Sequence, residues 1–254
     1  MDKRKAAAHW EANAEVWTAQ ARAGFDRYRD LVNTPGFLAL LPDIAGQHGL
    51  DIGCGEAGNT ALLRARGARM TALDISPTFL RHAAAAHPAV RFVRADAGGL
   101  PFADACFDFA TAFMSLMDMP HHEQVMAEAF RVLRPGGFLQ LSILHPCFVP
   151  PQCPRARGAP VALEVGGYFD RIDGRVDRWW FGITTAEQRA RVPAFREPRF
   201  HRTLSHWLNL LARCGFVLEA AGEPHADPAT AAAEPYVADT RVAPLFLHLR
   251  GHKP

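Results

Sequence analysis

The sequence predicts an α/β fold, a doubly wound and mostly parallel sheet of seven strands with helices on both faces. Two observations predict it. Short apolar segments alternate with amphipathic helical segments between residues 48 and 144. Few polar residues interrupt the apolar segments, which is typical of strands buried on both faces. The expected strands are residues 48–53, 69–74, 90–94, 107–113, 138–144, 216–220 and 242–249.

The expected helices have recognisable ends. Ser76-Pro77 is typical of a helix start, with serine as the N-cap and proline at the first helical position. Gly67 is a suitable residue to follow the helix expected at residues 59–66. Hydrophobic periodicity predicts further helices at residues 6–22, 121–133 and 204–211.

The 254 residues are expected to form one domain with two additions. Residues 1–35 are expected to form an N-terminal helical cap. Residues 146–200 are rich in Pro, Gly, Arg and aromatic residues, and we interpret them as a lid inserted after the fifth strand. Within them, Asp173-Gly174 between two apolar segments predicts a β-hairpin. Residues 222–241 are rich in Ala, Pro and acidic residues and are expected to be a mobile loop.

Composition excludes several classes of partner. The formal net charge is only +2, and the basic residues are scattered, which favours neither nucleic acid nor an anionic membrane. Five cysteines, at positions 54, 106, 147, 153 and 214, form no CxxC pair and are typical of reduced thiols. The sequence has no signal-peptide pattern and no 18-residue apolar span. We expect a cytoplasmic monomer or homodimer.

A glycine-rich turn is the most informative motif. Gly53-Cys54-Gly55, followed by Gly58, ends the first expected strand and opens a helix, so the backbone can come close to a ligand. Asp74 ends the second strand, 21 residues after Gly53, where a carboxylate can accept hydrogen bonds from a ribose diol. This pattern fits both NAD and S-adenosylmethionine (SAM).

Two positions favour SAM. Asp51 precedes the turn, where a carboxylate suits an ammonium or sulfonium group, directly or through water; alternatively it caps a turn or helix. Asp96 and Ala97 follow the third strand, where they can bind the polar edge of adenine; alternatively Asp96 is a turn residue before Gly98. The helix–strand–loop–strand ending of the chain is the third feature in favour of SAM.

Five motifs in order resemble the class I SAM-dependent methyltransferases. They are Leu50-Asp51-Ile52-Gly53-Cys54-Gly55, Leu73-Asp74-Ile75-Ser76, Ala95-Asp96-Ala97, Phe107-Asp108-Phe109 and Arg131-Val132-Leu133-Arg134-Pro135-Gly136-Gly137. The resemblance covers roughly residues 10–145 and 200–250. It implies a Rossmann-like methyltransferase fold with the last strand antiparallel, SAM as the cofactor and S-adenosylhomocysteine as its product.

The resemblance also implies roles for individual residues. Gly53, Cys54 and Gly55 would contact the methionine portion of SAM through the backbone, although Cys54 also fits as a small apolar filler. Asp74 would bind the ribose. The adenine would pack on Ile75 and meet Asp96 and Ala97, the sulfonium would lie near Phe113 and Met114, and Tyr28 would cover the cofactor.

Candidate acceptor residues follow the fifth strand. His145 is the candidate catalytic base, because an imidazole is partly neutral at pH 7; alternatively it hydrogen-bonds the loop and anchors the insertion. Adjacent strand residues point to opposite faces, so Trp179 and Trp180 cannot both be core, and one is expected to face the acceptor. Tyr168 would belong to the same aromatic lid. His201 could bind an anionic or carbonyl group, or merely cap the next helix.

The function expected from these features is transfer of a methyl group from SAM to an O or N atom of a small aromatic or heteroaromatic acceptor, by in-line displacement, in secondary metabolism. The alternatives are an NAD(P)-dependent oxidoreductase and a non-catalytic SAM-binding module. A protein or RNA methyltransferase is disfavoured by the weak charge and the expected lid. No metal site is expected, because His121-His122 have no apparent carboxylate or thiolate partners.

Overall fold

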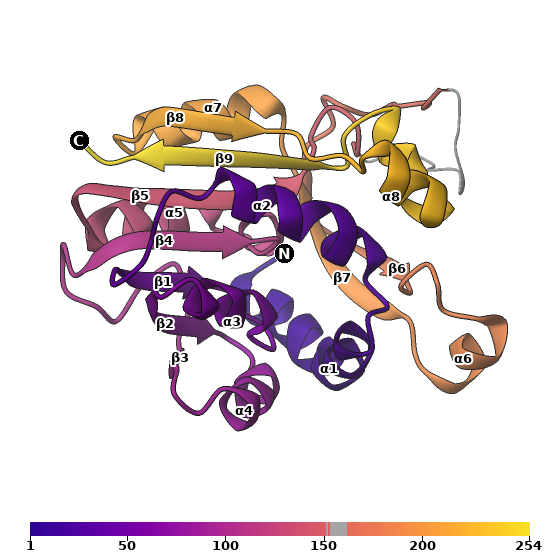
Figure 1. Ribbon diagram of the computed structural model, residues 1–254, viewed down its shortest axis with the longest axis horizontal. Helices are drawn as coiled ribbons and strands as arrows, with labels where there is room; N and C mark the ends of the chain where they lie inside the picture. Colours follow the sequence, from indigo (N-terminus) through magenta and orange to yellow (C-terminus); the bar gives the residue numbers. More distant parts are fainter. Residues whose placement is uncertain (151, 153–161) are drawn as a thin grey trace.

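The computed structural model describes residues 1–150, 152 and 162–254, and its centre is a seven-stranded sheet (Figure 1). The strand order is β3-β2-β1-β4-β5-β9-β8; the first five strands are parallel, and β9 runs antiparallel to both β5 and β8. The predicted fold class and the antiparallel last strand are confirmed. The strands are β1 (His48–Ile52), β2 (Arg69–Asp74), β3 (Arg91–Arg94), β4 (Phe107–Phe113), β5 (Leu133–Leu144), β8 (Val217–Gly222) and β9 (Phe246–His252).

Helices cover both faces of this sheet. On one face α5 and α7 bury apolar side chains such as Met126 and Leu211 against β4, β5 and β9. On the other face, Leu63 of α3 and the partly buried Leu38 of α2 pack over β2 and β4. The helices are α1 (Lys3–Arg22), α2 (Thr34–Leu40), α3 (Gly58–Ala65), α4 (Pro77–Ala86), α5 (His122–Val132), α6 (Ala186–Arg191), α7 (Leu204–Arg213) and α8 (Pro228–Ala233), with shorter helical turns η1 (Arg29–Asn33), η2 (Leu116–Asp118) and η3 (Pro235–Arg241).

The register of the parallel strands brings the predicted motifs to one edge. Ile52 lies opposite Leu73, and Asp51 lies opposite Thr111, so the carboxyl ends of β1, β2 and β4 meet. Figure 1 shows α1, β6 (Ile172–Trp179), β7 (Phe195–His201) and α8 gathered beyond the arrowhead of β4. In doubly wound sheets, this edge is where ligands bind.

The hairpin predicted at Asp173-Gly174 is wrong. Strand β6 runs through both residues, and its antiparallel partner β7 begins only after α6. Gly174 adopts a φ of +96° within a register irregularity between Asp173 and Arg175. A positive φ serves a β-bulge as well as a tight turn, so the dipeptide alone does not distinguish them. Part of the predicted insertion, together with Cys153, lies outside the described residues.

The loop expected at residues 222–241 is also wrong, because these residues form α8 and η3. Asp227 is the N-cap of α8, accepting hydrogen bonds from two backbone N–H groups, and Pro228 occupies the first turn. Val237 and Asp239 of η3 are fully buried. The alanine-rich composition was therefore a helix signal, and β9 begins at Phe246 rather than at residue 242.

One further strand boundary differs from expectation. Strand β5 begins at Leu133, so the Arg-Pro-Gly-Gly segment expected to precede the strand is part of it.

Among the described residues, no helix combines the length and the apolarity needed to cross a bilayer.

Candidate functional site

A cavity of about 520 Å³ lies at the carboxyl edge of the sheet, within the size range of small-molecule sites. Its walls come from the turn after β1, the ends of β2 and β4, helix α1 and the β6–β7 pair. Thirteen of the predicted site residues line it: Tyr28, Gly53, Cys54, Gly55, Asp74, Ile75, Asp96, Ala97, Phe113, Met114, Trp179, Trp180 and His201. The remaining three, Asp51, His145 and Tyr168, do not.

The glycine turn is held by hydrogen bonds within the protein. The N–H groups of Gly53 and Cys54 both donate to the Leu73 carbonyl at 2.9 Å, and the Gly55 N–H donates to Asp74 Oδ2 at 2.9 Å. Both glycines have a positive φ, and a Cβ on Gly55 would meet no atom within 4 Å. The turn therefore offers open space to a ligand, but these three N–H donors are already used.

Asp74 is held at the end of β2 and can accept further hydrogen bonds. The side chain is 9% exposed, and Oδ1 and Oδ2 accept from the N–H groups of Ser76 and Gly55, each at 2.9 Å. Burial raises the pKa of this carboxyl, and the amide hydrogen bonds oppose the increase. Each carboxylate oxygen has a second lone pair, so Asp74 can still accept two hydrogen bonds from a ligand.

Asp96 contacts the N-terminal helix. Lys3 Nζ of α1 lies 2.8 Å from Asp96 Oδ2, and the Gly98 N–H donates to Asp96 Oδ1 at 3.0 Å. Burial acts to raise the pKa of Asp96, but these two hydrogen bonds hold it below its ordinary value. Asp96 is thus both a turn residue, through its bond to Gly98, and a residue of the cavity wall. Lys3 was not predicted, because it is 93 positions away in the sequence.

Asp51 lies beneath the turn rather than in the cavity. Its oxygens accept from Thr60 Oγ1 at 2.5 Å and Thr111 Oγ1 at 3.0 Å, and the side chain is 2% exposed. Burial raises its pKa to about 6. The expected direct contact between Asp51 and a ligand is wrong, because its oxygens point to hydroxyls of α3 and β4. This acid joins the start of α3 to the sheet.

An ion pair that sequence reasoning did not single out flanks the turn. Arg29 Nη1 lies 3.3 Å from Glu56 Oε1, and both residues line the cavity. A Cβ on Gly58 would lie 2.1 Å from Arg29 Nη2, so a larger residue there would displace the end of this side chain. The preceding residue, Tyr28, donates its hydroxyl to Asp239 Oδ1 of η3 at 3.0 Å. The N-terminal segment is thereby joined both to the turn and to η3.

A pair of largely buried acids occupies another wall of the cavity. Asp118, which ends η2, is 7% exposed, Glu197 of β7 is partly buried, and the two carboxyl groups are close enough to affect each other's ionisation. The indole N–H of Trp179 donates to Glu197. Burial raises the pKa of Asp118 well above its ordinary range and that of Glu197 to about 7, against the opposing charge of Arg199. The pair therefore retains a proton near neutral pH.

Only one member of this acid pair carried a signal in the sequence. Asp118 is a lone acid in the apolar segment at residues 116–119, a pattern that marks a polar group facing an enclosed site. Glu197 lies in a charged segment, where an acid is usually solvated. Pairing of β7 with β6 is what directs Glu197 inward.

His145 does not contact the cavity, so the prediction that it is the catalytic base is wrong. Its side chain is 2% exposed; Nε2 donates to Glu223 Oε1 at 2.8 Å, and Nδ1 accepts from the Cys147 N–H at 3.2 Å. Burial lowers its pKa. Both nitrogens are used to hold the loop after β5, which is the alternative that the sequence left open.

We expect His145→Ala to destabilise the fold without a specific loss of function. The truncation removes a buried ring and leaves the partly buried Cys147 N–H without its acceptor, at a cost of about 1–3 kcal/mol in the free energy of unfolding, whereas the exposed Glu223 carboxylate can be solvated by water. Thermal denaturation should show a lower Tm, while ligand affinity and turnover, measured well below that Tm, should change less than about threefold. A large loss of turnover with an unchanged Tm would restore the catalytic role.

The aromatic residues of the insertion divide between the cavity wall and loop packing. Trp179 contacts Trp17 edge-to-face, with ring centroids 5.6 Å apart, and Trp180 donates to the Val192 carbonyl at 3.2 Å; both line the cavity. Tyr168 is outside it, because its hydroxyl accepts from the Leu204 N–H at the start of α7. The prediction that Tyr168 contacts substrate is therefore wrong. His201 lines the cavity but donates to the Tyr168 carbonyl at 2.8 Å.

Comparisons with known proteins agree with this geometry. Residues 50–141 match a family described as a methyltransferase domain. A SAM-dependent methyltransferase from Mesorhizobium loti is 26% identical, with a TM-score of 0.70 over 86% of this chain and 96% of that one. Residues 50–141 are therefore similar to a methyltransferase domain, and the fold of the chain is that of SAM-dependent methyltransferases. A second structure, from Listeria monocytogenes, shares this fold, with a TM-score of 0.71 at 19% identity, covering 87% of this chain and 96% of that one.

The curated relatives share only part of their length with this chain. Malonyl-[acyl-carrier protein] O-methyltransferase from Pectobacterium atrosepticum is 33% identical over 127 residues, which is 49% of this chain and 50% of that protein. A phthiotriol/phenolphthiotriol dimycocerosates methyltransferase from Mycobacterium ulcerans is 34% identical over 46% of this chain and 45% of that one. The chain thus spans about half the length of the curated relatives it matches.

The Mesorhizobium loti neighbour is SAM-dependent, and the residues that line this cavity fit SAM as a cofactor. Gly55 borders open space, Asp74 has free acceptor capacity, and Arg29 with Glu56 supplies one charge of each sign. A dinucleotide pyrophosphate would need the turn's N–H donors, which are already used by Leu73 and Asp74. The turn therefore disfavours the NAD(P) alternative.

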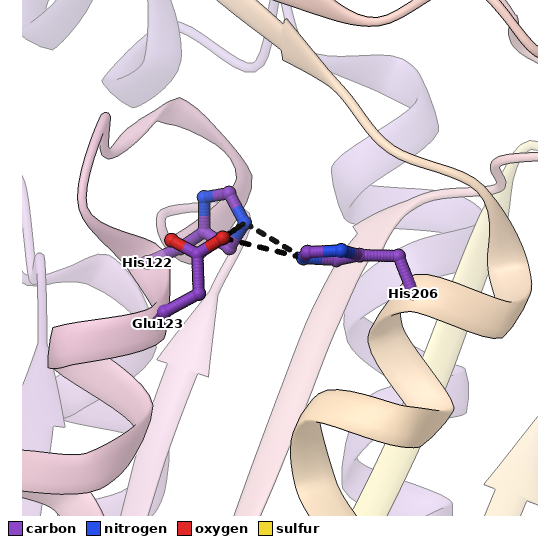
Figure 2. Close-up of side chains that lie close together, drawn as sticks. All are labelled: His122, Glu123 and His206. Carbon is purple, nitrogen blue, oxygen red and sulfur yellow. Dashed lines mark hydrogen bonds and ion pairs between the residues drawn. The ribbon is translucent and has the colours of Figure 1, made fainter. Parts of the chain in front are cut away.

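A histidine–glutamate cluster lies outside the cavity lining. His122 is fully buried, and Figure 2 shows it facing His206 with Glu123 beside both. The expectation that the His121-His122 pair has no carboxylate nearby is wrong. The residues that complete the cluster are the next one in the helix and one 84 positions away.

Proposed function

We propose that this chain transfers the methyl group of SAM to a nitrogen or oxygen atom of a small planar acceptor by in-line displacement. The observation that carries the proposal is the largely buried Asp118–Glu197 pair, which lines the same cavity as the glycine turn. One half of the cavity suits a nucleoside cofactor. The other half offers a proton acceptor to a group that must lose a proton.

In this proposal, residues of the cofactor half of the cavity contact SAM at three places. Asp74 accepts from the ribose diol, while Asp96 and Ala97 with Ile75 bind the adenine. Arg29 and Glu56 are complementary in charge to the carboxylate and ammonium groups of the methionine portion. Bound SAM supplies an electrophilic methyl carbon on a sulfonium.

The acceptor half combines aromatic surface with largely buried acids. Trp179 and Trp180 offer flat apolar surface and, as part of the proposed lid at residues 146–200, would exclude water from the reaction. The Asp118–Glu197 pair would accept a hydrogen bond from an acceptor N–H or O–H and then take its proton. The same acids repel carboxylates, so the arrangement favours a heteroaromatic or amine nitrogen first and a phenol second.

The proposed base predicts a pH dependence. Because the deprotonated pair is the active form and the pKa of Glu197 is raised to about 7, kcat/KM should rise as the pH increases through about 7 and then level off. The charged groups around Glu197 are Asp118, Arg199 and Asp177. Initial rates at saturating SAM between about pH 5.5 and 9 test this. A flat profile across that range would exclude the pair as the base.

The experiment for the proposed function is transfer of a tritiated methyl group from SAM to a panel of acceptors. The panel should contain matched pairs: heteroaromatic N–H compounds, phenols of similar size, and carboxylates including a malonyl thioester, which represents the substrate class named for the Pectobacterium relative. We expect turnover with N–H compounds or phenols and none with carboxylates. Binding of S-adenosylhomocysteine without transfer to any panel member would favour the non-catalytic SAM-binding alternative, and preferential transfer to carboxylates would overturn the proposal.

A further inference from the structure

The cluster of His122, Glu123 and His206 lies where the first turns of α5 and α7 meet (Figure 2). The Nε2 atoms of the two histidines are 3.0 Å apart. Glu123 Oε1 lies 3.4 Å from His122 Nε2 and 3.7 Å from His206 Nε2. Three atoms of ligand type thus form a compact triangle.

The size of this triangle is that of a tetrahedral metal site. Zinc binds imidazole nitrogen and carboxylate oxygen at about 2.0–2.1 Å, so two ligand atoms at the tetrahedral angle are about 3.3–3.4 Å apart. The three measured separations, 3.0, 3.4 and 3.7 Å, bracket this value. Two histidines and one glutamate are also a donor set that Zn²⁺ accepts.

The surroundings orient His122 as a ligand. Its Nδ1 lies 3.2 Å from the Met119 carbonyl oxygen, which can only accept, so Nδ1 carries the proton. The lone pair of Nε2 then faces His206 and Glu123, and a backbone carbonyl behind a ligand histidine is the usual support in zinc sites.

Nearby cations do not fill the cluster. The positive charges of Arg202 and Arg171 are near enough to affect His206 electrostatically. Both guanidinium groups pair with Asp173, which offsets their charge. A hydrogen bond from His206 to His122 would account only for the 3.0 Å contact. The Glu123 oxygen would still face two imidazole nitrogens at 3.4 and 3.7 Å, beyond an ordinary hydrogen-bond length. A cation between the three groups satisfies all of them.

We propose that His122, Glu123 and His206 bind one Zn²⁺ ion, with water as the fourth ligand. The site is separate from the proposed methyl-transfer chemistry, because none of the three residues lines the cavity. It does support the cavity wall: the His122 ring packs on Trp207, with ring centroids 4.9 Å apart, and Trp207 is a wall residue. A bound ion would fix the junction of α5 and α7 behind that wall.

Zinc titration of the full chain tests the proposal. The chain is stripped with a chelator, and its thiols are alkylated to remove cysteine as a competing ligand; Zn²⁺ is then titrated by calorimetry. We expect one equivalent to bind, an increase in Tm on binding, and X-ray absorption fitted by nitrogen and oxygen ligands alone at about 2.0–2.1 Å.

Three variants distinguish this site from incidental binding. His206→Ala should abolish binding, and Glu123→Gln should weaken it at least tenfold while keeping the fold, since Glu123 is 44% exposed. The matched control is His82→Ala, which removes a surface histidine paired with a single carboxylate, Glu15, at 2.7 Å, and should leave binding unchanged. No binding to the wild type, or equal binding to wild type and Glu123→Gln, would overturn the proposal whether or not His206→Ala folds.

Discussion

Replacing Asp74 with alanine should weaken SAM binding by more than tenfold. The carboxylate is the group at the end of β2 with free acceptor capacity, and it also fixes the N–H groups of Gly55 and Ser76. Its removal takes two proposed hydrogen bonds from the ribose and loosens the turn that borders the cofactor. Loss of two charge-assisted hydrogen bonds corresponds to about 2–4 kcal/mol, which is more than tenfold in Kd. Calorimetric titration with S-adenosylhomocysteine measures the effect.

A matched control separates binding from folding in this experiment. Asp51→Asn changes an equally buried acid on the neighbouring strand that does not line the cavity. It should lower the Tm by weakening the contacts with Thr60 and Thr111, while changing the affinity less than about threefold. Unchanged affinity in Asp74→Ala, or an equal loss in both variants, would refute the ribose assignment.

Replacing Asp118 with asparagine should lower kcat by about a hundredfold or more, the usual effect of losing a positioned acid–base group. The amide keeps the shape of the side chain but cannot take up a proton from the acceptor. SAM affinity should change less than about twofold, because the cofactor contacts lie on other residues. Single-turnover methyl transfer from bound SAM measures the chemical step directly.

The control for this variant lies at the opposite end of the sheet. Asp108→Asn alters an acid on β4 that pairs with Arg134 and accepts from the His48 N–H, away from the cavity lining. We expect it to affect stability but not the methyl-transfer rate. If Asp118→Asn keeps wild-type kcat, or if its loss appears in SAM affinity instead, Asp118 is not part of the base.

Local sequence patterns predicted the sheet and the cofactor edge well, for a physical reason. Parallel strands bring their carboxyl ends together, so Gly53, Asp74 and Ala97 could be assigned to one edge from their positions after successive strands. The same patterns left out Lys3, which reaches this edge from the N-terminal helix, and the pairing of Arg29 with Glu56. Such contacts depend on how a helix packs, which strand periodicity does not record.

The acceptor side was harder to predict because its geometry is long-range. The position of His145 directly after β5 predicts a catalytic role. In the structure, however, His145 Nε2 bonds to Glu223, 78 positions away, and the ring does not line the cavity. Glu197 faces inward because β7 pairs with β6 across a helical connection, and the Asp173-Gly174 signal indicated a different pairing. A glycine with positive φ predicts a local backbone shape, not which segments pair.

A crystal structure of the chain with S-adenosylhomocysteine is the most direct measurement of the central claim, that one cavity contains both a SAM site and an acid pair for the acceptor. The account predicts the ribose hydroxyls within hydrogen-bond distance of Asp74, roughly 2.5–3.2 Å. It also predicts the sulfur facing the Phe113–Met114 segment, with Asp118 and Glu197 lining the space beyond it. A nucleoside bound away from Asp74, or one that fills the space beside Asp118 and Glu197, would contradict it.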